Sequence, residues 1–477
     1  MRILYIASEA VPFAKTGGLA DVMGALPKFV RQLGHEAAVI MPRYRGIQTK
    51  KILIPSLTVA LGGELRFCCI QESGPIGGVR YFFVDYGEYF NREDLYLTNH
   101  QDYPDNAERF AFLSLASLEF AKRASLAPDV IHCNDWQTAL VPVYLKTLYE
   151  NDLFFQKTKT LLTIHNMAYQ GVFPRTALDR ISLPQSLYNP EGLEFFGNIC
   201  LLKGGILFAD KLSTVSRRYS EEILTPHFGY GLEGVLQKRA STLVGILNGV
   251  DYSQWDPETD PYLAANYSIE NLAGKKTCKK DLLDLFGIPE SIRRPVIGII
   301  SRLAYQKGFD LLLNVGENII EDGWSLVAIG TGEEKYANYF LKLKERYPSY
   351  VGVKIMYDEA LAHKIEAGAD LFLMPSRYEP CGLNQIYSLR YGTVPLVRAT
   401  GGLDDTISDF DQSPEPTGFK FSSTTPAELL HTVRRALAVY STPKRWSQLM
   451  KNGMSKDYSW HQSARQYVEA YQSLLLA

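Results

Sequence analysis

The alternation of short apolar runs with helical stretches, in two successive blocks, is the feature that most constrains how this chain can fold. Each apolar run is followed by glycine or polar residues and then by apolar residues at helical spacing. After residues 3–7, for example, Leu19, Val22, Met23 and Leu26 recur in this way. Neighbouring parallel strands need helical crossovers, so the alternation favours parallel sheets covered by helices on both faces. The sequence therefore predicts an α/β fold with two doubly wound parallel-sheet domains.

The predicted strands define the two blocks and the boundary between them. In the first block they lie at residues 3–7, 39–41, 130–133, 161–164 and 211–215, and in the second at 296–300, 326–329, 354–356, 371–374 and 396–397, with helices such as 308–320 and 384–391. Between the blocks, residues 248–251 precede a segment rich in Asp, Pro, Glu and Thr, which is typical of a hinge. We therefore place the first domain at residues 1–245. Two such domains predict a cleft faced by the carboxyl ends of the strands, where ligands bind in open α/β sheets.

Composition narrows the classes of function. The 477 residues are 46% hydrophobic and 21% charged, as in soluble globular proteins, and a formal net charge of -2 offers no basic surface for nucleic acid or an anionic membrane. No apolar run approaches the roughly 18 residues of a membrane helix. The apolar stretch over residues 1–14 is short and contains Glu9, which favours a first strand over a signal peptide. The six scattered cysteines suit free thiols, so we expect a cytoplasmic protein.

The sequence predicts neither a metal site nor a cofactor. No cysteine lies in a CxxC pair or beside histidines at the spacing of zinc ligands. Asp409-Phe410-Asp411 has the form DxD, but it lies in a polar loop without a preceding strand, and we interpret it as solvated. HExxH, GxSxG and serine–histidine arrangements are also absent from the sequence.

The first cluster that could carry chemistry is Lys15-Thr16-Gly17-Gly18-Leu19-Ala20-Asp21, between a strand and a helix. Two adjacent glycines allow a ligand to approach the backbone, the helix start presents unpaired N–H groups, and Lys15 adds a positive charge. This pattern is suited to a phosphate, although it is neither a GxGxxG nor a Walker loop. An ordinary strand-to-helix turn with a solvated lysine is the alternative.

Three further clusters follow strands of the second block. Arg302 and Lys307 flank a turn and could both bind phosphate oxygens, while simple solvation is the alternative for each. In the loop over residues 375–385, Glu379 is placed to accept hydrogen bonds from hydroxyls near a bound phosphate, or else to cap the next helix. Residues 400–403, Thr-Gly-Gly-Leu, repeat the succession of strand, glycine and helix.

Polar residues also follow two buried strands of the first block, as Asn134-Asp135-Trp136 and as His165-Asn166. Polar groups at such positions are costly unless they are hydrogen-bonded or functional. A hydrogen-bonded structural histidine is the alternative to a functional one. The aromatic residues of segment 81–112 could stack on sugar rings, although we interpret most of them as packing.

Together these clusters resemble one family, the bacterial glycogen synthases and plant starch synthases that use ADP-glucose. The strings that carry the resemblance are Lys15-Thr16-Gly17-Gly18-Leu19-Ala20-Asp21-Val22, His165-Asn166-Met167-Ala168-Tyr169-Gln170-Gly171, Asn248-Gly249-Val250-Asp251, Ser301-Arg302-Leu303 with Gln306-Lys307-Gly308, Pro375-Ser376-Arg377-Tyr378-Glu379-Pro380-Cys381-Gly382-Leu383, and Thr400-Gly401-Gly402-Leu403. They run in the family's order and cover essentially the whole chain. The Lys-Thr-Gly-Gly and Glu-Pro-Cys-Gly-Leu strings are highly specific together.

The resemblance implies a GT-B fold, in which two Rossmann-like domains face each other across a cleft and close over a sugar nucleotide. On the basis of this resemblance, we divide the rest of the chain into a second domain at residues 246–456 and a final segment at 457–477. The last helix, near 460–476, is expected to cross back to the N-terminal domain.

The resemblance also assigns roles to residues. It implies that Arg302 and Lys307 hold the donor diphosphate, with Lys15 and the amides of Gly17 and Gly18 adding positive charge. Glu379 should contact the donor glucose, Tyr357 should stack on adenine, Asp21 should touch sugar, and Asp135 and His165 should line the reaction centre. The remaining substrate-binding residues that it implies are Asn166, Asn248, Cys381, Gly382, Leu383, Thr400 and Gly401.

The implied activity is transfer of glucose from ADP-glucose to the non-reducing end of an α-1,4-glucan, with retention of configuration. Positive groups would stabilise charge on the leaving diphosphate, so no metal is required, and we expect a front-side reaction without a covalent intermediate. Many retaining glycosyltransferases have a second acid eight positions after the first, where this chain and its family have Tyr387, which leaves open what holds the ribose. The expected partners are ADP-glucose and glycogen, and neither nucleic acid nor membrane, with the oligomeric state open.

Four alternatives remain at this stage. A glycosyltransferase that uses UDP-glucose and a sugar-nucleotide epimerase could share the architecture. A non-catalytic glucan-binding protein would need no diphosphate site. A phosphorylase would need a lysine that carries pyridoxal phosphate.

Overall fold

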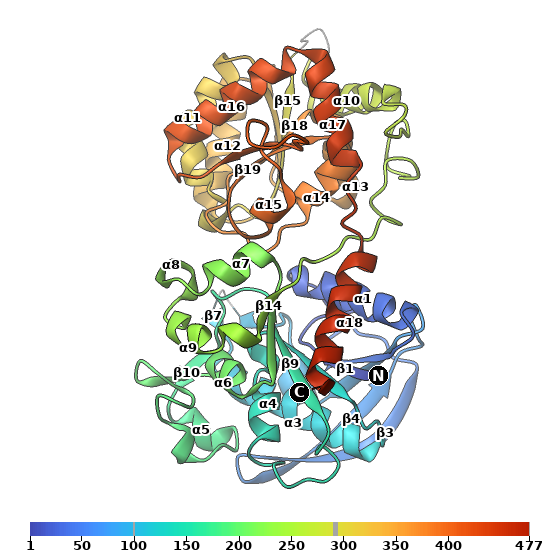
Figure 1. Cartoon of the computed structure of the whole chain (residues 1–477), viewed down its shortest axis with the longest axis vertical. Helices are drawn as coiled ribbons and strands as arrows, with labels where there is room; N and C mark the ends of the chain where they lie inside the picture. Colours follow the sequence, from blue (N-terminus) through green and yellow to red (C-terminus); the bar gives the residue numbers. More distant parts are fainter. Residues whose placement is uncertain (99–100, 290–293, 477) are drawn as a thin grey trace. The chain divides into compact units, whose positions relative to one another are not determined.

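The computed structural model describes residues 1–98, 101–289 and 294–476, and the chain divides into two compact units (Figure 1). The first domain comprises residues 1–215, 220–249 and those from Trp460 onward. The second domain comprises Ser216–Tyr219 and Val250–Ser459. The boundaries between the domains thus fall after Gly249 and Ser459. The sequence had placed them a few residues earlier, after residues 245 and 456. Residues 216–219 group with the second domain, where the Arg218 amide donates a hydrogen bond of 2.9 Å to Asp405.

The first domain contains a nine-stranded sheet. Its order is β14 (Leu243–Gly245), β13 (Lys211–Thr214), β9 (Lys159–Ile164), β8 (Val130–Asn134), β1 (Arg2–Ile6), β2 (Glu36–Pro42), β5 (Arg80–Asp85), β4 (Glu64–Glu72) and β3 (Lys51–Leu61). The pairs from β14 to β5 are parallel, whereas β4 pairs antiparallel with both β5 and β3. The predicted parallel sheet is therefore confirmed except at this edge, where the short turn at Gly62-Gly63 joins β3 directly to β4.

Helices cover both faces of this sheet because its central strands are apolar on both sides; every residue of β8, for example, is buried. The longer helices are α1 (Gly18–Gln32), α3 (Asn106–Arg123), α6 (Leu201–Phe208) and α18 (Trp460–Leu476). The shorter elements are α2 (Gly87–Phe90), β6 (Leu97–Thr98), β7 (Gln101–Asp102), η1 (Trp136–Thr138), α4 (Leu140–Leu145), β10 (Val172–Pro174), α5 (Ala177–Arg180), η2 (Gln185–Leu187), β11 (Glu194–Phe195), β12 (Asn198–Cys200), α7 (Arg217–Glu222), α8 (Pro226–Gly229), α9 (Glu233–Lys238) and η3 (Ala240–Thr242).

The last helix, α18, belongs to the first domain and packs beside α1 (Figure 1). A buried polar network attaches it to the sheet. The Tyr471 hydroxyl lies 2.8 Å from Nδ1 of His132 and 3.1 Å from the Tyr5 hydroxyl, and His132 Nε2 lies 2.6 Å from Oγ1 of Thr163. Burial lowers the pKa of His132 to about 3, so the ring is neutral and can share its hydrogen bonds without a charge in the core.

The second domain contains a six-stranded parallel sheet. Its order is β17 (Val351–Lys354), β16 (Ser325–Ile329), β15 (Val296–Ile300), β18 (Leu371–Met374), β19 (Val394–Arg398) and β20 (Phe419–Phe421). The helical elements are α10 (Ala273–Phe286), η4 (Tyr305–Lys307), α11 (Phe309–Glu321), α12 (Glu334–Arg346), α13 (Glu359–Gly368), α14 (Asn384–Arg390), α15 (Gly401–Thr406), α16 (Pro426–Tyr440) and α17 (Pro443–Met454).

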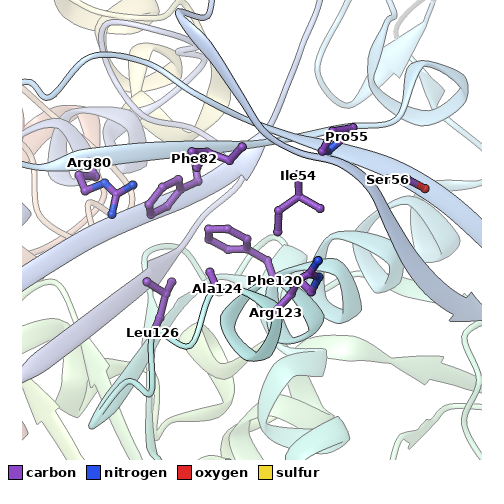
Figure 2. A pocket seen from close by; sticks show the side chains of 10 residues that line it. Ile54, Pro55, Ser56, Arg80, Phe82, Phe120, Arg123, Ala124 and Leu126 are labelled. Carbon is purple, nitrogen blue, oxygen red and sulfur yellow. The ribbon is translucent and has the colours of Figure 1, made fainter.

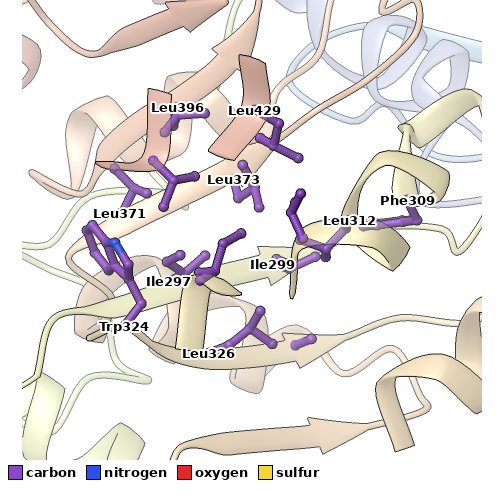
Figure 3. Packing of buried hydrophobic residues seen from close by; sticks show 14 of the residues in the cluster. Ile297, Ile299, Phe309, Leu312, Trp324, Leu326, Leu371, Leu373, Leu396 and Leu429 are labelled. Atoms are coloured by element: carbon purple, nitrogen blue, oxygen red, sulfur yellow. The ribbon is translucent and has the colours of Figure 1, made fainter. Parts of the chain in front are cut away.

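Successive residues of these strands enter two different cores. Ile297 and Ile299 pack with Leu312 of α11 and Leu429 of α16, as Figure 3 shows, whereas Val296 packs in the cluster on the opposite face. Each buried aliphatic side chain stabilises the fold by about 1.5–3 kcal/mol. Successive side chains of a strand point to opposite faces of the sheet, and here both faces are buried. Most positions in these strands are therefore apolar, which explains the continuous apolar runs in the sequence.

Two predictions in the second domain were wrong. The strand expected at 354–356 is β17 at Val351–Lys354, because pairing with β16 ends at Lys354 and the apolar residues Ile355 and Met356 are exposed beyond it. Asp409 is not in a solvated loop: it is buried, accepts the Lys420 amide at 2.6 Å and lies 3.1 Å from Nη2 of Arg435. Most aromatic residues of segment 81–112 are buried, in agreement with the packing interpretation.

Among the residues that the structure describes, no helix is both long and apolar enough to cross a membrane.

Candidate active site

In the first domain, the candidate phosphate loop over residues 15–18 is built around a buried carboxylate, that of Glu9. Glu9 Oε2 accepts the Thr16 amide at 2.5 Å and the Gly17 amide at 3.3 Å. Glu9 Oε1 accepts the hydroxyls of Thr16 and Tyr96, each at 2.7 Å. The Gly17 N–H, which the resemblance assigns to the donor, donates to Glu9 in this structure. The sequence interpretation did not include Glu9 in the site, although an acidic residue directly after a buried strand was a usable signal.

Lys15 and Asp21 of this loop form an ion pair. The Lys15 ammonium lies 2.7 Å from Oδ1 of Asp21, and about half of the lysine side chain is exposed (52%). Gly18 is the first residue of α1, so its N–H is one of those without an intrahelical acceptor. The loop therefore presents the half-exposed Lys15 ammonium and the N-terminus of α1. Glu9 holds the loop backbone by accepting the amides of Thr16 and Gly17.

Asp135 and His165 come together at the carboxyl ends of the neighbouring strands β8 and β9. Asp135 Oδ1 accepts the His165 amide at 2.7 Å, and the carboxylate also accepts the Asn166 amide. Burial raises the pKa of Asp135 to about 7, against the opposite effect of these two N–H donors. The backbone of Asp135 has a φ of 56°, an uncommon conformation for a residue with a side chain. Such local strain is concentrated at functional sites.

Asn134 determines which nitrogen of His165 carries the proton. The Asn134 side-chain amide donates to the carbonyls of Ile6 and His132 at 3.1 and 3.3 Å, which leaves its Oδ1 as an acceptor 3.0 Å from His165 Nε2. His165 Nε2 therefore donates, and Nδ1 carries the lone pair. Burial lowers the pKa of His165 to about 3, so the imidazole is neutral and Nδ1 can accept a hydrogen bond from a hydroxyl.

In the second domain, the structure brings Lys307 and Glu379 together. The Lys307 ammonium lies 2.6 Å from Oε2 of Glu379, and Ser376 donates to the same oxygen at 3.0 Å. Both side chains are largely buried (17% and 8% exposed). The approach depends on Gly308, which has a φ of +72° and whose absent Cβ would collide with the carbonyl oxygen of Pro375. The loops that follow β15 and β18 can therefore lie against each other.

Arg302 precedes this pair on an exposed turn, with its Nη2 3.4 Å from Oε1 of Gln306. The guanidinium is thus held only weakly and can bind an anion in place of the Gln306 side chain. Gln306 itself donates to the carbonyl of Tyr378 at 3.3 Å, which attaches the Arg302 turn to the Glu379 loop.

The loop of Glu379 and the start of α15 are packed back to back. The Gly402 amide donates to the Glu379 carbonyl at 3.2 Å, and a Cβ on Gly401 would collide with that same carbonyl. Cys381, Gly382, Leu383 and Thr400 lie in these two segments and are brought close to Glu379 by this packing. Arg398, which sequence reasoning missed, supports the loop by donating to the Ser376 carbonyl at 2.7 Å.

Two predicted residues lie apart from these clusters. Tyr357 precedes α13, with 58% of its surface exposed, and its hydroxyl donates to Glu359 at 2.5 Å. Asn248 is buried at the end of the first domain, and its Oδ1 has no hydrogen-bond partner within the described part of the chain. Tyr387, in the position of the second acid, stacks on Trp255 at 4.0 Å between ring centroids.

A cavity of about 370 Å³ opens elsewhere in the first domain, between β3, β5 and the end of α3. Figure 2 shows Ile54, Phe82, Phe120 and Leu126 pointing into it, with Arg80 and Arg123 at its sides. None of its lining residues belongs to the predicted site. All six cysteines are free thiols, and the described residues contain no group of three or more His, Cys, Asp or Glu side chains that could hold a metal ion.

Two family models match the chain. The model described as "Starch synthase catalytic domain" matches residues 2–238, and the model described as "Glycosyl transferases group 1" matches residues 286–452. Their matched ranges correspond to most of the first and second domains, respectively.

The chain is also similar to individual proteins over its whole length. It is 51% identical to a glycogen synthase of Koribacter versatilis, over 99% of this chain and 98% of that protein, and 45% identical to one of Thermotoga maritima, over 100% and 99%. Its structure resembles the catalytic domain of starch synthase IV from Arabidopsis thaliana bound to ADP and acarbose, with a TM-score of 0.91, 32% identity and coverage of 100% and 99%. A sucrose-phosphate synthase from Thermosynechococcus elongatus, at a TM-score of 0.63 and 18% identity over 100% and 99%, shares the fold.

Proposed function

This chain belongs to the glycogen and starch synthase family of glycosyltransferases, and from that premise we propose that it transfers glucose from ADP-glucose to the non-reducing end of an α-1,4-glucan, with retention of configuration. The observation that carries the proposal is the buried contact between Lys307 and Glu379 at the ends of two parallel strands, beside the exposed guanidinium of Arg302. A cation next to a carboxylate is suited to a ligand with a phosphate beside sugar hydroxyls.

The charge on these groups supports the reaction directly. Breaking the bond from the anomeric carbon to a nucleoside diphosphate builds negative charge on the leaving phosphate. Arg302 and Lys307 are proposed to neutralise it, with a share for Lys15, and Glu379 to accept hydrogen bonds from the glucose hydroxyls. Removing one such preorganised donor typically costs about 100- to 1000-fold in kcat.

The resemblance also supports proposed contacts for the nucleotide base and for the rest of the donor. Tyr357, which is exposed and precedes the N-cap residue Asp358 of α13, is proposed to stack on adenine. Thr400, Gly401 and the backbone of residues 381–383 are proposed to contact the donor. ADP bound to the similar starch synthase IV supports an adenine nucleotide over a uridine nucleotide.

Retention is proposed to follow a front-side route, in which the leaving phosphate accepts the proton of the acceptor hydroxyl. Asp135 and Glu379 are the two carboxylates that could be proposed as nucleophiles. The oxygens of Asp135 are directed to the amides of His165 and Asn166, and Oε2 of Glu379 is paired with Lys307. We therefore assign Asp135 to holding the His165 loop, and His165 Nδ1, together with Asn166, Asn248 and Asp21, to contacts with sugar. Trapping of a covalent glucosyl–enzyme would contradict this route.

The test is nucleotide release from ADP-glucose and from UDP-glucose, measured side by side with and without glycogen. We expect glycogen-dependent ADP release, chain elongation and little release of UDP. The Arg302→Ala/Lys307→Ala double variant should lose turnover while a Lys342→Ala control, on the exposed face of α12, should not. Preferred release of UDP would indicate the UDP-glucose transferase, and glycogen binding without any release would indicate a glucan-binding protein.

The compartment follows from the same proposal. Six free thiols are typical of a reducing environment, so we propose that the enzyme works in the cytoplasm.

A further inference from the structure

A stack of three rings lies in the second domain, with two rings buried, those of Trp255 and His363, and one partly buried, that of Tyr387. The indole of Trp255 is sandwiched between the imidazole of His363, at 3.7 Å between ring centroids and 14° between planes, and the phenol of Tyr387, at 4.0 Å and 9°. Trp255 comes from the segment that follows the domain boundary, His363 from α13 and Tyr387 from α14. The stack therefore joins three segments that are far apart in sequence.

The imidazole in this stack lies between two carboxylates, with a hydrogen bond at Nδ1 and a longer ion-pair contact at Nε2. His363 Nδ1 lies 2.7 Å from Oδ2 of Asp260, and the Tyr391 hydroxyl donates to the same oxygen at 2.5 Å. Hydrogen bonds and charges of Asp260 and Glu359 raise the pKa of His363 to about 9, although burial opposes this. The imidazolium therefore lies on the face of an indole, which is a favourable cation–π arrangement.

The second ring nitrogen of His363, Nε2, faces the half-exposed side chain of Glu359. His363 Nε2 lies 3.7 Å from Oε1 of Glu359, one turn earlier in α13, and Glu359 Oε2 accepts the hydroxyl of Tyr357 at 2.5 Å. A continuous chain of polar contacts thus runs from buried Asp260 through His363 and Glu359 to the exposed ring of Tyr357.

We propose that Asp260, His363 and Glu359 are positioning residues for the nucleotide base, with Trp255 holding the imidazolium in place. They orient Tyr357 and fix the first turn of α13 against α14, the helix that begins directly after the donor loop at residues 381–383. This inference rests on the proposed function, because it takes Tyr357 to be the residue that stacks on adenine.

A purely structural explanation of the cluster is less economical. Apolar residues of similar volume often stabilise a core as well as a buried ion pair does, so stability alone does not require charge at Asp260 and His363. Stability does not require the Glu359 carboxylate either, because its side chain is 51% exposed. What the charged chain adds is a defined direction for the Tyr357 hydroxyl, because that hydroxyl donates to the Glu359 carboxylate.

Glu359→Gln and Tyr357→Phe test the chain at its exposed end, where the fold is least affected. Tyr357→Phe removes the hydrogen bond, and Glu359→Gln weakens it by removing the charge of the acceptor, so each should raise the KM for ADP-glucose and the Kd for ADP by about 3- to 10-fold. The kcat should stay within about twofold, because neither group meets the transferred glucose. The double variant should be no worse than Tyr357→Phe alone, since both changes act on one interaction.

Three controls make the result specific. Glu345→Gln, an exposed glutamate of α12, should change nothing. Inhibition by inorganic pyrophosphate, which has no base, should be the same in all variants. Asp260→Asn, at the buried end, should raise the Kd for ADP in the same direction and also lower the melting temperature.

Unchanged ADP affinity in Glu359→Gln, or additive losses in the double variant, would overturn the inference. ADP binding is measured by calorimetry on the full chain, independently of turnover. If the wild-type protein does not release ADP from ADP-glucose, the proposed function fails. If it does and the variants bind ADP normally, only the inference fails.

Discussion

The Glu9→Gln substitution tests how the candidate phosphate loop is held. In the wild-type protein one carboxylate oxygen accepts the amides of Thr16 and Gly17, and the other accepts two hydroxyls, those of Thr16 and Tyr96. Glutamine has almost the same shape but a single acceptor oxygen and no charge. If that oxygen faces the amides, the hydroxyls can rotate to accept from the new NH₂ group, so the packing survives while the charge is lost.

The expected magnitude follows from the two amide hydrogen bonds. A hydrogen bond to a charged group contributes about 1.5–3 kcal/mol and a neutral one about 0.5–1.5, so two bonds lose roughly 2 kcal/mol in total. One factor of ten corresponds to about 1.4 kcal/mol, which makes the loop's ordered state about 30-fold less favoured. We therefore expect kcat/KM to fall by up to about 30-fold, because Lys15 is presented by this loop.

The assay is glucose transfer from ADP-glucose to glycogen, with melting temperature measured in parallel. Glu36→Gln serves as the matched control, since Glu36 is an exposed glutamate at the start of β2 in the same domain. Thr16→Val, which removes the hydroxyl but keeps both amide bonds, should have a smaller effect than Glu9→Gln. Wild-type kcat/KM in Glu9→Gln, or an equal loss in Glu36→Gln, would refute the reasoning.

The remaining predictions concern charge and buried polar contacts. Lys307→Ala should lower kcat by about 100- to 1000-fold and also lower the melting temperature, because it leaves the Glu379 carboxylate buried without its cation; adding Glu379→Gln should restore the melting temperature but not the activity. The pKa of His363 is raised from 6.5 to about 9, so the stability due to its charge, on the order of 3 kcal/mol, is fully present below pH 6.5 and is lost as the pH rises through 9. Calorimetry between pH 6.5 and 9.5 should show this fall in the wild type and a flatter profile in Asp260→Asn. Tyr471→Phe should destabilise the first domain by about 1–3 kcal/mol, since it leaves two buried partners unsatisfied; an unchanged melting temperature would contradict the network.

Much of the fold could be predicted because strands buried on both faces leave a continuous apolar signature, as at residues 130–133 and 371–374. The antiparallel edge was missed because β3 and β4 are only partly buried, so their apolar residues are mixed with polar ones. The Gly62-Gly63 turn between them was a hairpin signal that local analysis could have used.

The site was predicted as separate clusters but not as contacts. Lys307 and Glu379 each follow a strand, yet only the adjacency of β15 and β18 in the sheet brings them to 2.6 Å, and strand order is not written in a single sequence. Glu9 was missed because two of its partners are backbone amides, which look alike at every position, and a third, the Tyr96 hydroxyl, is far away in sequence. His363 was missed because a histidine inside a helix gives no sign of the aspartate that will charge it.

The position of α18 has a consequence for how the newly synthesised chain folds. Its residues from Trp460 onward complete the core of the first domain, yet they are synthesised after all of Val250–Ser459. Until they emerge from the ribosome, His132 lacks its Tyr471 partner and the apolar face that α18 covers remains open to water. The first domain therefore cannot complete its packing until the whole of the second domain has been synthesised.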